Sequence, residues 1–368
     1  MMTVLHVQQQ AVMMPQKLLE RDYLRMKNTC PLLFCCAIFT LTTNLVFSEG
    51  TSLSRSDHIK VFNEAQRCYN STHNASFVRK RDCAKRALEA GRFIFEPDSL
   101  NIAALTYNYG NALNRRDEKL DVLGQALELY EAIYGKSSLE VIDVLIDMGA
   151  TRKVIAIAKK YFEKDSVEYA DVLLELAMSN MLSLNNTSRY ADSALEIYLE
   201  EEGVESYNTA AASFQMGKVK FAKEKYKSAI PYLIGATKHP EIATFAHGWL
   251  VRAYGLTNQD DMASYHATQI GQSQKGERRD YVPIFVPPAN YPRSAQREGR
   301  EGYAIIELTI STEGRAIDIG LVEESPEYYG FGDSALEAAN RLLYAPRFVD
   351  GQAKEVSGVL YKYTFNMA

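Results

Sequence analysis

Hydrophobic residues between about Asp57 and Gln272 recur at the three- and four-residue spacing of an amphipathic helix. Short polar turns interrupt this pattern, and strand-like alternation of β-branched residues is scarce. The pattern therefore predicts a series of helices. After Pro287 the period changes to two, which predicts strands with one buried face.

Two alternating runs near the C-terminus predict a pair of strands. The first, residues 303–311, places four apolar side chains on one face, namely Ala304, Ile306, Leu308 and Ile310. The second, residues 316–322, does the same with Ile317, Ile319 and Leu321. Gly314 lies between the runs, where a tight hairpin requires a positive φ. We therefore expect two antiparallel strands joined by a hairpin.

An amphipathic helix is predicted at residues 333–344. Its apolar residues are Ala335, Ala338, Ala339, Leu342 and Leu343. Pro346 ends the helix, because the residue before a proline avoids the helical region. An aromatic and β-branched run at residues 356–366 predicts a third strand. The sum is a small α+β domain, in which one helix packs on a three-stranded antiparallel sheet.

The last strand matters for function, because a three-stranded sheet has two edges. Its main residues are Val359, Leu360, Tyr361, Lys362, Tyr363, Thr364 and Phe365. Unpaired N–H and C=O groups on an edge can pair with another chain, which is recognition by β-strand addition. Lys362 is a charge of the kind that blunts an edge, so an ordinary edge without a partner is the alternative interpretation.

The order of features in residues 287–368 resembles the C-terminal domain of the TonB family. The features are Tyr291-Pro292 before the first strand, the hairpin with its Gly-rich turn, and Arg347-Phe348 followed by Asp350-Gly351. In that family the domain grasps the TonB box, an extended peptide of outer-membrane transporters. The resemblance implies that residues 359–365 contact such a peptide, together with the segment before the first strand. That segment contributes Asn290, Tyr291 and Pro292.

The chain departs from the energy transducers of that family in two respects. Those proteins have a membrane anchor with a functional histidine and a long Pro-rich spacer. Here the apolar run at residues 31–47 has no histidine, and the 11 prolines of the chain form no rigid rod. Both departures weigh against direct coupling to a proton-driven motor in the inner membrane.

The helical region repeats with a period of about 34 residues. Gly217 lies twelve residues before Ala229 and Leu233 four after it, a spacing that resembles the tetratricopeptide (TPR) repeat. The equivalent alanines are Ala126, Ala158, Ala194 and Ala263, and small positions of first helices are marked by Gly110 and Gly149. Residues 55–272 are therefore predicted to form an all-α, TPR-like solenoid of five repeats after a divergent first hairpin. The concave face of such an array usually binds a peptide or another protein.

Cys68 and Cys83 flank a short loop between two helical patterns of the first hairpin. They could therefore face each other across that hairpin, and an even pair in an oxidising compartment is most simply a disulfide. Two buried free thiols are the alternative.

The N-terminus indicates export. Met26-Lys27 precedes the apolar run at residues 31–47, which is too short for a confident transmembrane span of roughly 20 apolar residues. Residues 26–48 are thus predicted to be a signal peptide or an uncleaved anchor, and the protein is expected in the periplasm of a Gram-negative bacterium. Residues 1–25 fit neither interpretation and suggest that Met26 is the true start. Residues 273–286 are predicted to link the two domains.

Catalytic and metal-binding motifs are missing from the sequence. None of the 6 histidines falls in the C-terminal domain, and there is no Cys-x-x-Cys pair, no Gly-x-Ser-x-Gly elbow and no P-loop. The net charge of −5 argues against nucleic acid and anionic membranes as partners. The sequence therefore predicts no catalytic residue, metal or cofactor.

Taken together, the patterns predict a non-enzymatic, periplasmic adaptor. Its C-terminal domain would bind a TonB-box-like peptide of an outer-membrane transporter, and its repeats would dock a second protein. One alternative is an energy transducer that stays anchored in the inner membrane and faces the periplasm. The other is a structural protein of envelope assembly that forms a homodimer through its exposed edge.

Overall fold

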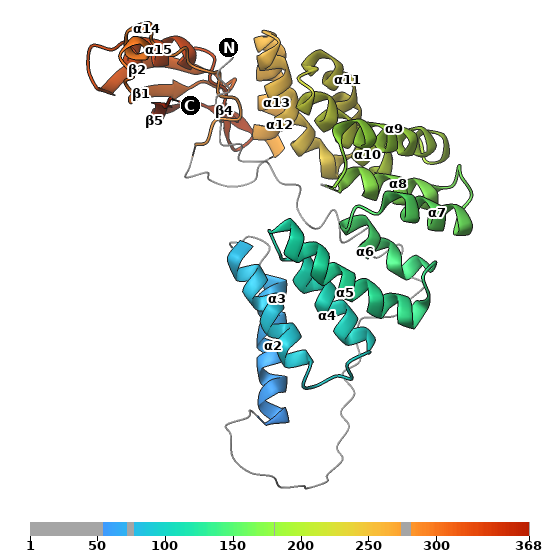
Figure 1. Cartoon of the computed structure of the whole chain (residues 1–368). Helices are drawn as coiled ribbons and strands as arrows, with labels where there is room; N and C mark the ends of the chain where they lie inside the picture. Colours follow the sequence, from blue (N-terminus) through green and yellow to red (C-terminus); the bar gives the residue numbers. More distant parts are fainter. Residues whose placement is uncertain (1–53, 72–76, 180, 274–280, 368) are drawn as a thin grey trace. The chain divides into compact units, whose positions relative to one another are not determined.

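The computed structural model describes residues 54–71, 77–179, 181–273 and 281–367. These residues form two compact units (Figure 1). One unit comprises the residues up to Lys164 together with Ser179–Met181, and the other comprises Asp165–Met178 and the residues from Leu182 onward. The predicted order, helical repeats followed by a small domain with a three-stranded antiparallel sheet, is confirmed.

The first unit consists of helices that pack as hairpins. They are α2 (Arg55–Ser71), α3 (Phe77–Gly91), α4 (Leu100–Asn111), α5 (Arg116–Tyr134), the short 3₁₀ helix η3 (Leu139–Val141), α6 (Ile142–Asp147) and α7 (Thr151–Tyr161). Helix α2 packs on α3 and α4 packs on α5. Ser99 caps α4 by accepting a hydrogen bond from the backbone N–H of Ile102, so one of the free donors at that end is satisfied.

The second unit begins with six helices that pair in the same way. They are α8 (Val167–Met178), α9 (Leu184–Glu201), α10 (Tyr207–Ala222), α11 (Tyr226–Ala236), α12 (Pro240–Leu256) and α13 (Asp260–Ser273). Ser183 and Ser206 cap α9 and α10. Each helix packs on its neighbour in the chain from α8 to α13, so the six helices form three consecutive hairpins.

The repeat alanines lie in the second helix of each hairpin, and none of them is exposed: Ala126, Ala158, Ala194, Ala229 and Ala263. Gly217 packs against Leu233, and a Cβ atom there would lie 2.5 Å from the leucine side chain. Gly110 is packed in the same way. Gly149 was wrongly predicted as a first-helix position, because it follows α6 with φ +75° and forms the turn before α7.

The C-terminal domain completes the second unit. Its elements are α14 (Arg293–Arg297), β1 (Gly302–Ile310), β2 (Ala316–Ser325), α15 (Phe331–Ala339), β3 (Arg347–Val349), β4 (Gln352–Lys354) and β5 (Val356–Phe365). Strands β2, β1 and β5 form one antiparallel sheet with β1 in the centre, and β3 and β4 form a separate hairpin. Helix α15 packs on β1 and β2. The predicted α+β domain therefore has one additional hairpin.

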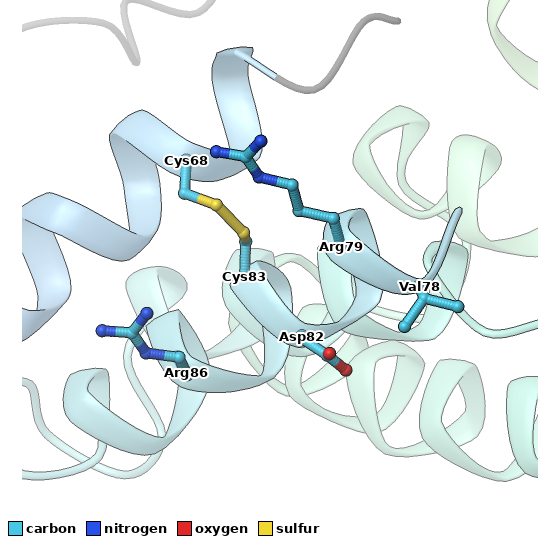
Figure 2. A pocket seen from close by; sticks show the side chains of 6 residues that line it. All are labelled: Cys68, Val78, Arg79, Asp82, Cys83 and Arg86. Atoms are coloured by element: carbon cyan, nitrogen blue, oxygen red, sulfur yellow. A yellow bond between two sulfur atoms is a disulfide. The ribbon is translucent and has the colours of Figure 1, made fainter. Parts of the chain in front are cut away.

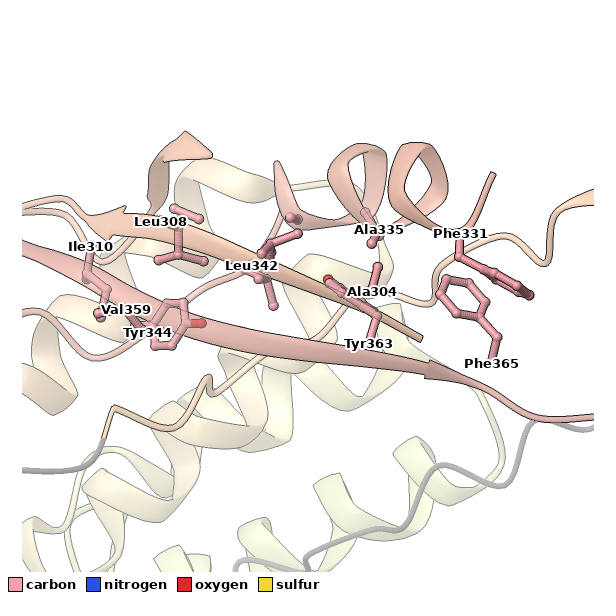
Figure 3. Close-up of a cluster of buried hydrophobic side chains, with 14 of the residues drawn as sticks. Ala304, Leu308, Ile310, Phe331, Ala335, Leu342, Tyr344, Val359, Tyr363 and Phe365 are labelled. Atoms are coloured by element: carbon pink, nitrogen blue, oxygen red, sulfur yellow. The ribbon is translucent and has the colours of Figure 1, made fainter. Parts of the chain in front are cut away.

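The core of this domain lies between α15 and the sheet (Figure 3). The predicted inward face of β1 is confirmed, since Ala304, Ile306, Leu308 and Ile310 are all buried. Phe331 and Ala335 of α15 meet them from the helix, and Tyr363 and Phe365 meet them from β5. Gly314 has the predicted positive φ, +79°, in the hairpin between β1 and β2.

The predicted common face of Ile317, Ile319 and Leu321 is wrong. Ile317 pairs with Thr309, whereas Leu321 pairs with Ile306, and these two β1 residues point to opposite faces. A bulge between the two pairs causes the switch, with Asp318 at φ 50°. A bulge adds one residue to one strand, so an alternation pattern read across it changes face.

Helix α15 ends five residues earlier than predicted, at Ala339 rather than at residue 344. The backbone of Leu343 instead forms isolated bridges with Phe285 and Arg315. Leu342 and Leu343 are nevertheless buried, as their spacing predicted. The chain leaves the helix because strand-like backbone partners are available at this point.

The segment before the C-terminal domain holds this domain against the last helical hairpin. Phe285 pairs with Leu343 through backbone hydrogen bonds of 3.2 Å in both directions. Its ring lies against Gly255 of α12, where a Cβ atom would come within 2.8 Å of the ring. At Gly271 of α13, a Cβ atom would lie 2.5 Å from the backbone carbonyl oxygen of Pro346. Two glycines therefore allow the domain to approach both helices closely.

Two arginines of the C-terminal domain add polar contacts to the same junction. Arg341 donates to both carboxylate oxygens of Asp260, at 3.1 and 3.3 Å, and to the carbonyl of Gly255. Arg315 donates to the carboxylate of Asp261 at 2.8 Å. Helices α12 and α13 and the C-terminal domain are thus joined by packing and by charge-assisted hydrogen bonds.

The predicted extension (residues 1–25) and the predicted signal peptide or anchor (residues 26–48) lie outside the described residues. Among the helices that the structure does describe, none combines the length and the hydropathy that a membrane crossing requires.

Candidate functional site

Strand β5 lies at one edge of the three-stranded sheet. Its inner side pairs with β1 in an unbroken register from Gly302↔Phe365 to Leu308↔Val359. Its outer side pairs with no other strand of the described chain. A register shift and a positive φ at Gly358 interrupt the strand just before Val359. The regular part of the free edge is therefore residues 359–365.

The two faces of β5 differ in character. Val359, Tyr363 and Phe365 are buried and Tyr361 packs partly into the same core, whereas Leu360, Lys362 and Thr364 are exposed. The Lys362 ammonium lies 3.6 Å from the centroid of the Tyr303 ring on β1. Its charge is thus held over the sheet by a cation–π contact, so it leaves the backbone of the edge accessible.

Tyr291 braces the end of this edge. Its ring makes edge-to-face contacts with Phe365 at 5.9 Å and with Phe331 at 6.1 Å between centroids. Its hydroxyl donates to the carbonyl of Arg300 at 2.6 Å. Aromatic contacts of this geometry add stability beyond burial. The structure therefore places Tyr291 beside the end of β5, although Phe365 lies 74 residues later in the sequence.

Asn290 and Pro292 have local roles at the same place. The carbonyl of Asn290 accepts a hydrogen bond from Ser334 of α15, and Pro292 is the N-cap residue of α14. These contacts fix the path of the segment that holds Tyr291. Ser334 was not among the sequence-predicted site residues, since nothing in the sequence relates a serine of the helix to a segment 44 residues earlier.

Three tyrosines, two of them on β5 itself, pack together in the core of the domain behind this edge. Burial raises the pKa of Tyr344, Tyr361 and Tyr363, and the neighbouring phenols raise the pKa of Tyr344 and Tyr363 further. The hydroxyls of Tyr344 and Tyr363 are buried and have no hydrogen-bond partner among the described residues. These phenols stay neutral near pH 7, so the cluster provides packing rather than acid–base chemistry.

The opposite edge of the sheet is a poorer template for pairing. Register shifts interrupt β2 at two places, and Asp318 adopts a left-handed conformation. Bulges of this kind protect an edge, because they prevent a second strand from forming a continuous ladder. The edge of β5 is regular by comparison.

Cys68 and Cys83 are joined as a disulfide in the first unit and line a shallow hollow between α2 and α3 (Figure 2). The other residues around it are Val78, Arg79, Asp82 and Arg86. Asp82 forms an ion pair with Arg81 at 2.9 Å. Across the described residues, no group of three or more His, Cys, Asp or Glu side chains could hold a metal ion.

The structure thus defines a class: a helical-repeat protein whose C-terminal sheet domain has one regular free edge. A comparison with known protein families agrees with this description for the C-terminal domain. Residues 287–367 match the family model described as Gram-negative bacterial TonB protein C-terminal. This part of the chain is therefore a TonB C-terminal domain, as the sequence predicted. Proteins of this family are associated with the cell envelope of Gram-negative bacteria.

Two solved structures show a likeness to this chain, and one of them consists of TPR-like repeats. TPR-like repeats assigned to a kinesin light chain of Podosopora anserina are 14% identical, with a TM-score of 0.33, over 59% of this chain and 93% of theirs. BtubC (BKLC) from P. vanneervenii is 12% identical, with a TM-score of 0.34, over 64% of this chain and 97% of its own. No curated protein matches the sequence.

Proposed function

We propose that this protein is a non-enzymatic adaptor of the Gram-negative cell envelope, which captures an extended peptide along β5. The peptide would be the TonB box, or a similar segment, of an outer-membrane transporter. The observation that supports this proposal best is the regular, unpaired edge at residues 359–365, within a domain that matches the TonB C-terminal family. In this proposal the protein acts in the periplasm.

The energetics suit a reversible contact. Half of the backbone groups of an edge strand point outward, so a guest strand along residues 359–365 would form roughly six hydrogen bonds. Each contributes about 0.5–1.5 kcal/mol net, and part of this gain is offset by ordering the guest. The exposed side chains of Leu360, Lys362 and Thr364 would select among peptides, because a guest strand places alternate residues beside them.

The helical repeats would dock a second protein, which gives the adaptor two partners. TPR-like repeats support this part of the proposal, because a stack of helical hairpins offers an extended surface for proteins. The contacts of Phe285 and Arg341 with α12 and α13 would keep the two binding parts of the second unit together.

The proposal is tested by calorimetry with synthetic TonB-box peptides and the chain from residue 49 onward. We expect that Tyr361→Pro abolishes binding, because proline cannot donate to the ladder and interrupts the edge. Leu360→Lys changes only an exposed side chain and should alter peptide preference while the fold remains. The matched control is Val322→Pro, on the exposed part of β2. Equal binding by the wild type and by Tyr361→Pro would reject strand addition at β5.

Dimerisation through the same edge is a second candidate function, because a free edge can pair with its own copy. A molecular mass that doubles with concentration in the wild type, and not in Tyr361→Pro, would favour it. Retention in the membrane after carbonate washing of the full-length chain would instead favour an anchored energy transducer.

A further inference from the structure

The Cys68–Cys83 disulfide borders the hollow between α2 and α3 (Figure 2). The hollow has a volume of about 400 Å³, which lies within the range of sites for small molecules. Cys83 is buried, with 4% of its surface exposed, whereas Cys68 is only half-buried. Cys68 is therefore the residue of the pair that a solute reaches from this hollow.

Two arginines of α3 flank the disulfide. Arg79 lies four residues before Cys83 and Arg86 lies three residues after it, so the three side chains share one face of the helix. Both arginines line the hollow (Figure 2). The sequence of α3 thus places a positive charge on each side of the buried cysteine.

The acidic groups nearby cancel little of this charge. Asp82 also lines the hollow, but it forms its ion pair with Arg81, at 2.9 Å. Arg86 approaches Glu64 only at 4.0 Å, and these two side chains are 53% and 62% exposed, so the pair is weak. Helix α3 carries five basic and two acidic side chains, in a chain whose net charge is −5. The hollow is therefore a positive site in an acidic protein.

We propose that this hollow is a thiol-exchange site, where small thiols with a negative charge react reversibly with the disulfide at Cys68. The two arginines attract the anionic thiol and so raise its local concentration. Basic side chains also stabilise a thiolate, so Arg79 and Arg86 favour the departure of Cys83 in that form. The site lies in the first unit and does not depend on the function proposed for β5.

The exchange needs no reactant other than the thiol. The sulfur of the incoming thiolate forms a bond with Sγ of Cys68, and the bond between Cys68 and Cys83 breaks. The electron pair of that bond leaves with Sγ of Cys83, which becomes a thiolate. In the reverse step Cys83 attacks Cys68, expels the small thiolate and restores the disulfide.

The exchange changes how α2 is held. Ala65 is the one residue of α2 that is fully buried, and Phe62 packs partly against the same core cluster. With so little apolar burial, the disulfide contributes much of what ties α2 to α3. A small thiol on Cys68 removes this tie and lets α2 open locally, while α4 keeps its own core contacts.

The test compares two small thiols of opposite charge, mercaptoethanesulfonate and cysteamine, on the oxidised full chain. Reactions are stopped with acid, and tryptic peptides are analysed by mass spectrometry. Cys68 and Cys83 fall in different peptides, because residues 79–81 are all basic, and the three cysteines before residue 54 are followed separately. We expect the adduct on Cys68. Per thiolate, the anionic thiol should react about tenfold faster at low salt. This preference should disappear at 1 M salt, where the screening length is about 3 Å.

Charge variants separate steering by the arginines from simple exposure of the disulfide. Arg86→Gln should reduce the preference for the anionic thiol about threefold, because one exposed charge contributes modestly. The matched control is Arg92→Gln, which removes an exposed arginine just after α3 that does not line the hollow. Hydrogen exchange of the adduct should be faster in α2 and unchanged in α4.

Four outcomes would overturn the proposal. The first is that mercaptoethanesulfonate forms no adduct with the folded chain. The second is an equal rate, per thiolate, for the anionic and the cationic thiol at low salt. The third is an adduct on Cys83 rather than on Cys68. The fourth is an equal effect of Arg86→Gln and Arg92→Gln, since the charge of the whole hairpin, and not the hollow, would then set the rate.

Discussion

Arg341 is the side chain whose replacement tests most directly how the C-terminal domain is held on the last repeat. It lies just after α15 and reaches α12 and the start of α13, where it contacts Gly255 and Asp260. Arg341→Met removes the guanidinium and keeps most of the aliphatic length. The cation lies 5.8 Å from the Phe285 ring, so methionine preserves part of that packing. The loss is therefore mainly that of the hydrogen bonds.

The expected loss of stability follows from the solvent exposure of the Arg341–Asp260 pair. Hydrogen bonds to charged groups contribute about 1.5–3 kcal/mol when buried, and exposed ion pairs contribute about 0–1 kcal/mol. The side chains of Arg341 and Asp260 are 35% and 37% exposed, which places this pair between the two cases. We expect Arg341→Met to reduce the free energy of unfolding of the C-terminal domain by about 1–2 kcal/mol.

The assay is urea unfolding with two local probes. Trp249 fluorescence reports on α12, and hydrogen exchange of β1 reports on the C-terminal domain. In the wild type both probes should change together. In Arg341→Met the β1 transition should move to lower urea and precede that of Trp249. The control is Arg300→Met, an exposed arginine of the same domain. Coincident and unshifted transitions in Arg341→Met would refute the idea that this contact couples the two parts.

Three further predictions concern stability. Burial and a neighbouring imidazole lower the pKa of His266 to about 4, against 6.5 in its ordinary state. The contribution of this group to stability should thus be full above pH 6.5 and be lost as the pH falls from 6.5 to 4, because only the unfolded state gains the proton over that range. His266→Phe should remove about 3 kcal/mol of pH-dependent loss, measured by urea titrations at several pH values. Gly271→Ala places a Cβ atom 2.5 Å from the carbonyl oxygen of Pro346 and should reduce the free energy of unfolding by about 1–3 kcal/mol. The measurement is hydrogen exchange in the β3–β4 hairpin, which should become faster. Unchanged exchange would mean that α13 and this hairpin pack more loosely than described. Replacing Cys68 and Cys83 by serine should reduce the free energy of unfolding of the first hairpin by about 3 kcal/mol, and two titratable thiols in the denatured wild type would contradict the disulfide.

The repeats could be predicted from the sequence because their signal is local and recurs. Ala229 and its equivalents are buried at each step, since a small residue is required wherever two helices of a hairpin cross. Gly149 shows the limit of this reasoning. Glycine fits both a helix crossing and a turn with positive φ, and the 34-residue period does not separate these two uses.

The predictions from the sequence were wrong in the C-terminal domain where the backbone departs from regular strand or helix geometry. The bulge at Asp318 reverses the faces of β2, and the end of α15 depends on pairing of Leu343 with Phe285, which lies 58 residues earlier. The Asp350-Gly351 turn is a typical hairpin signal, yet the flanking strands β3 and β4 have three residues each and are too short to show alternation. Distant partners and single inserted residues have no local pattern.

For the same reason, only part of the candidate site could be predicted from the sequence. Residues 359–365 could be identified because an aromatic, β-branched run indicates a strand. Its position at the edge follows from the strand order, in which β1 takes the centre. The cation–π contact that draws Lys362 over Tyr303 depends on that order as well. The sequence suggested a charge that blunts the edge, whereas the fold turns this charge onto the sheet face.

The second unit contains two kinds of polar group, and the difference between them indicates where partners bind. Arg315 and Arg341 have carboxylate partners and hold the C-terminal domain on its helices. The outer backbone of β5, by contrast, pairs with no strand of the described chain. The N–H and C=O groups of an unpaired edge are hydrated in the isolated protein and remain available for pairing with another strand. A domain that satisfies its arginines at its own interface and leaves one regular strand edge unpaired has the arrangement that the proposed capture of an extended strand at β5 requires.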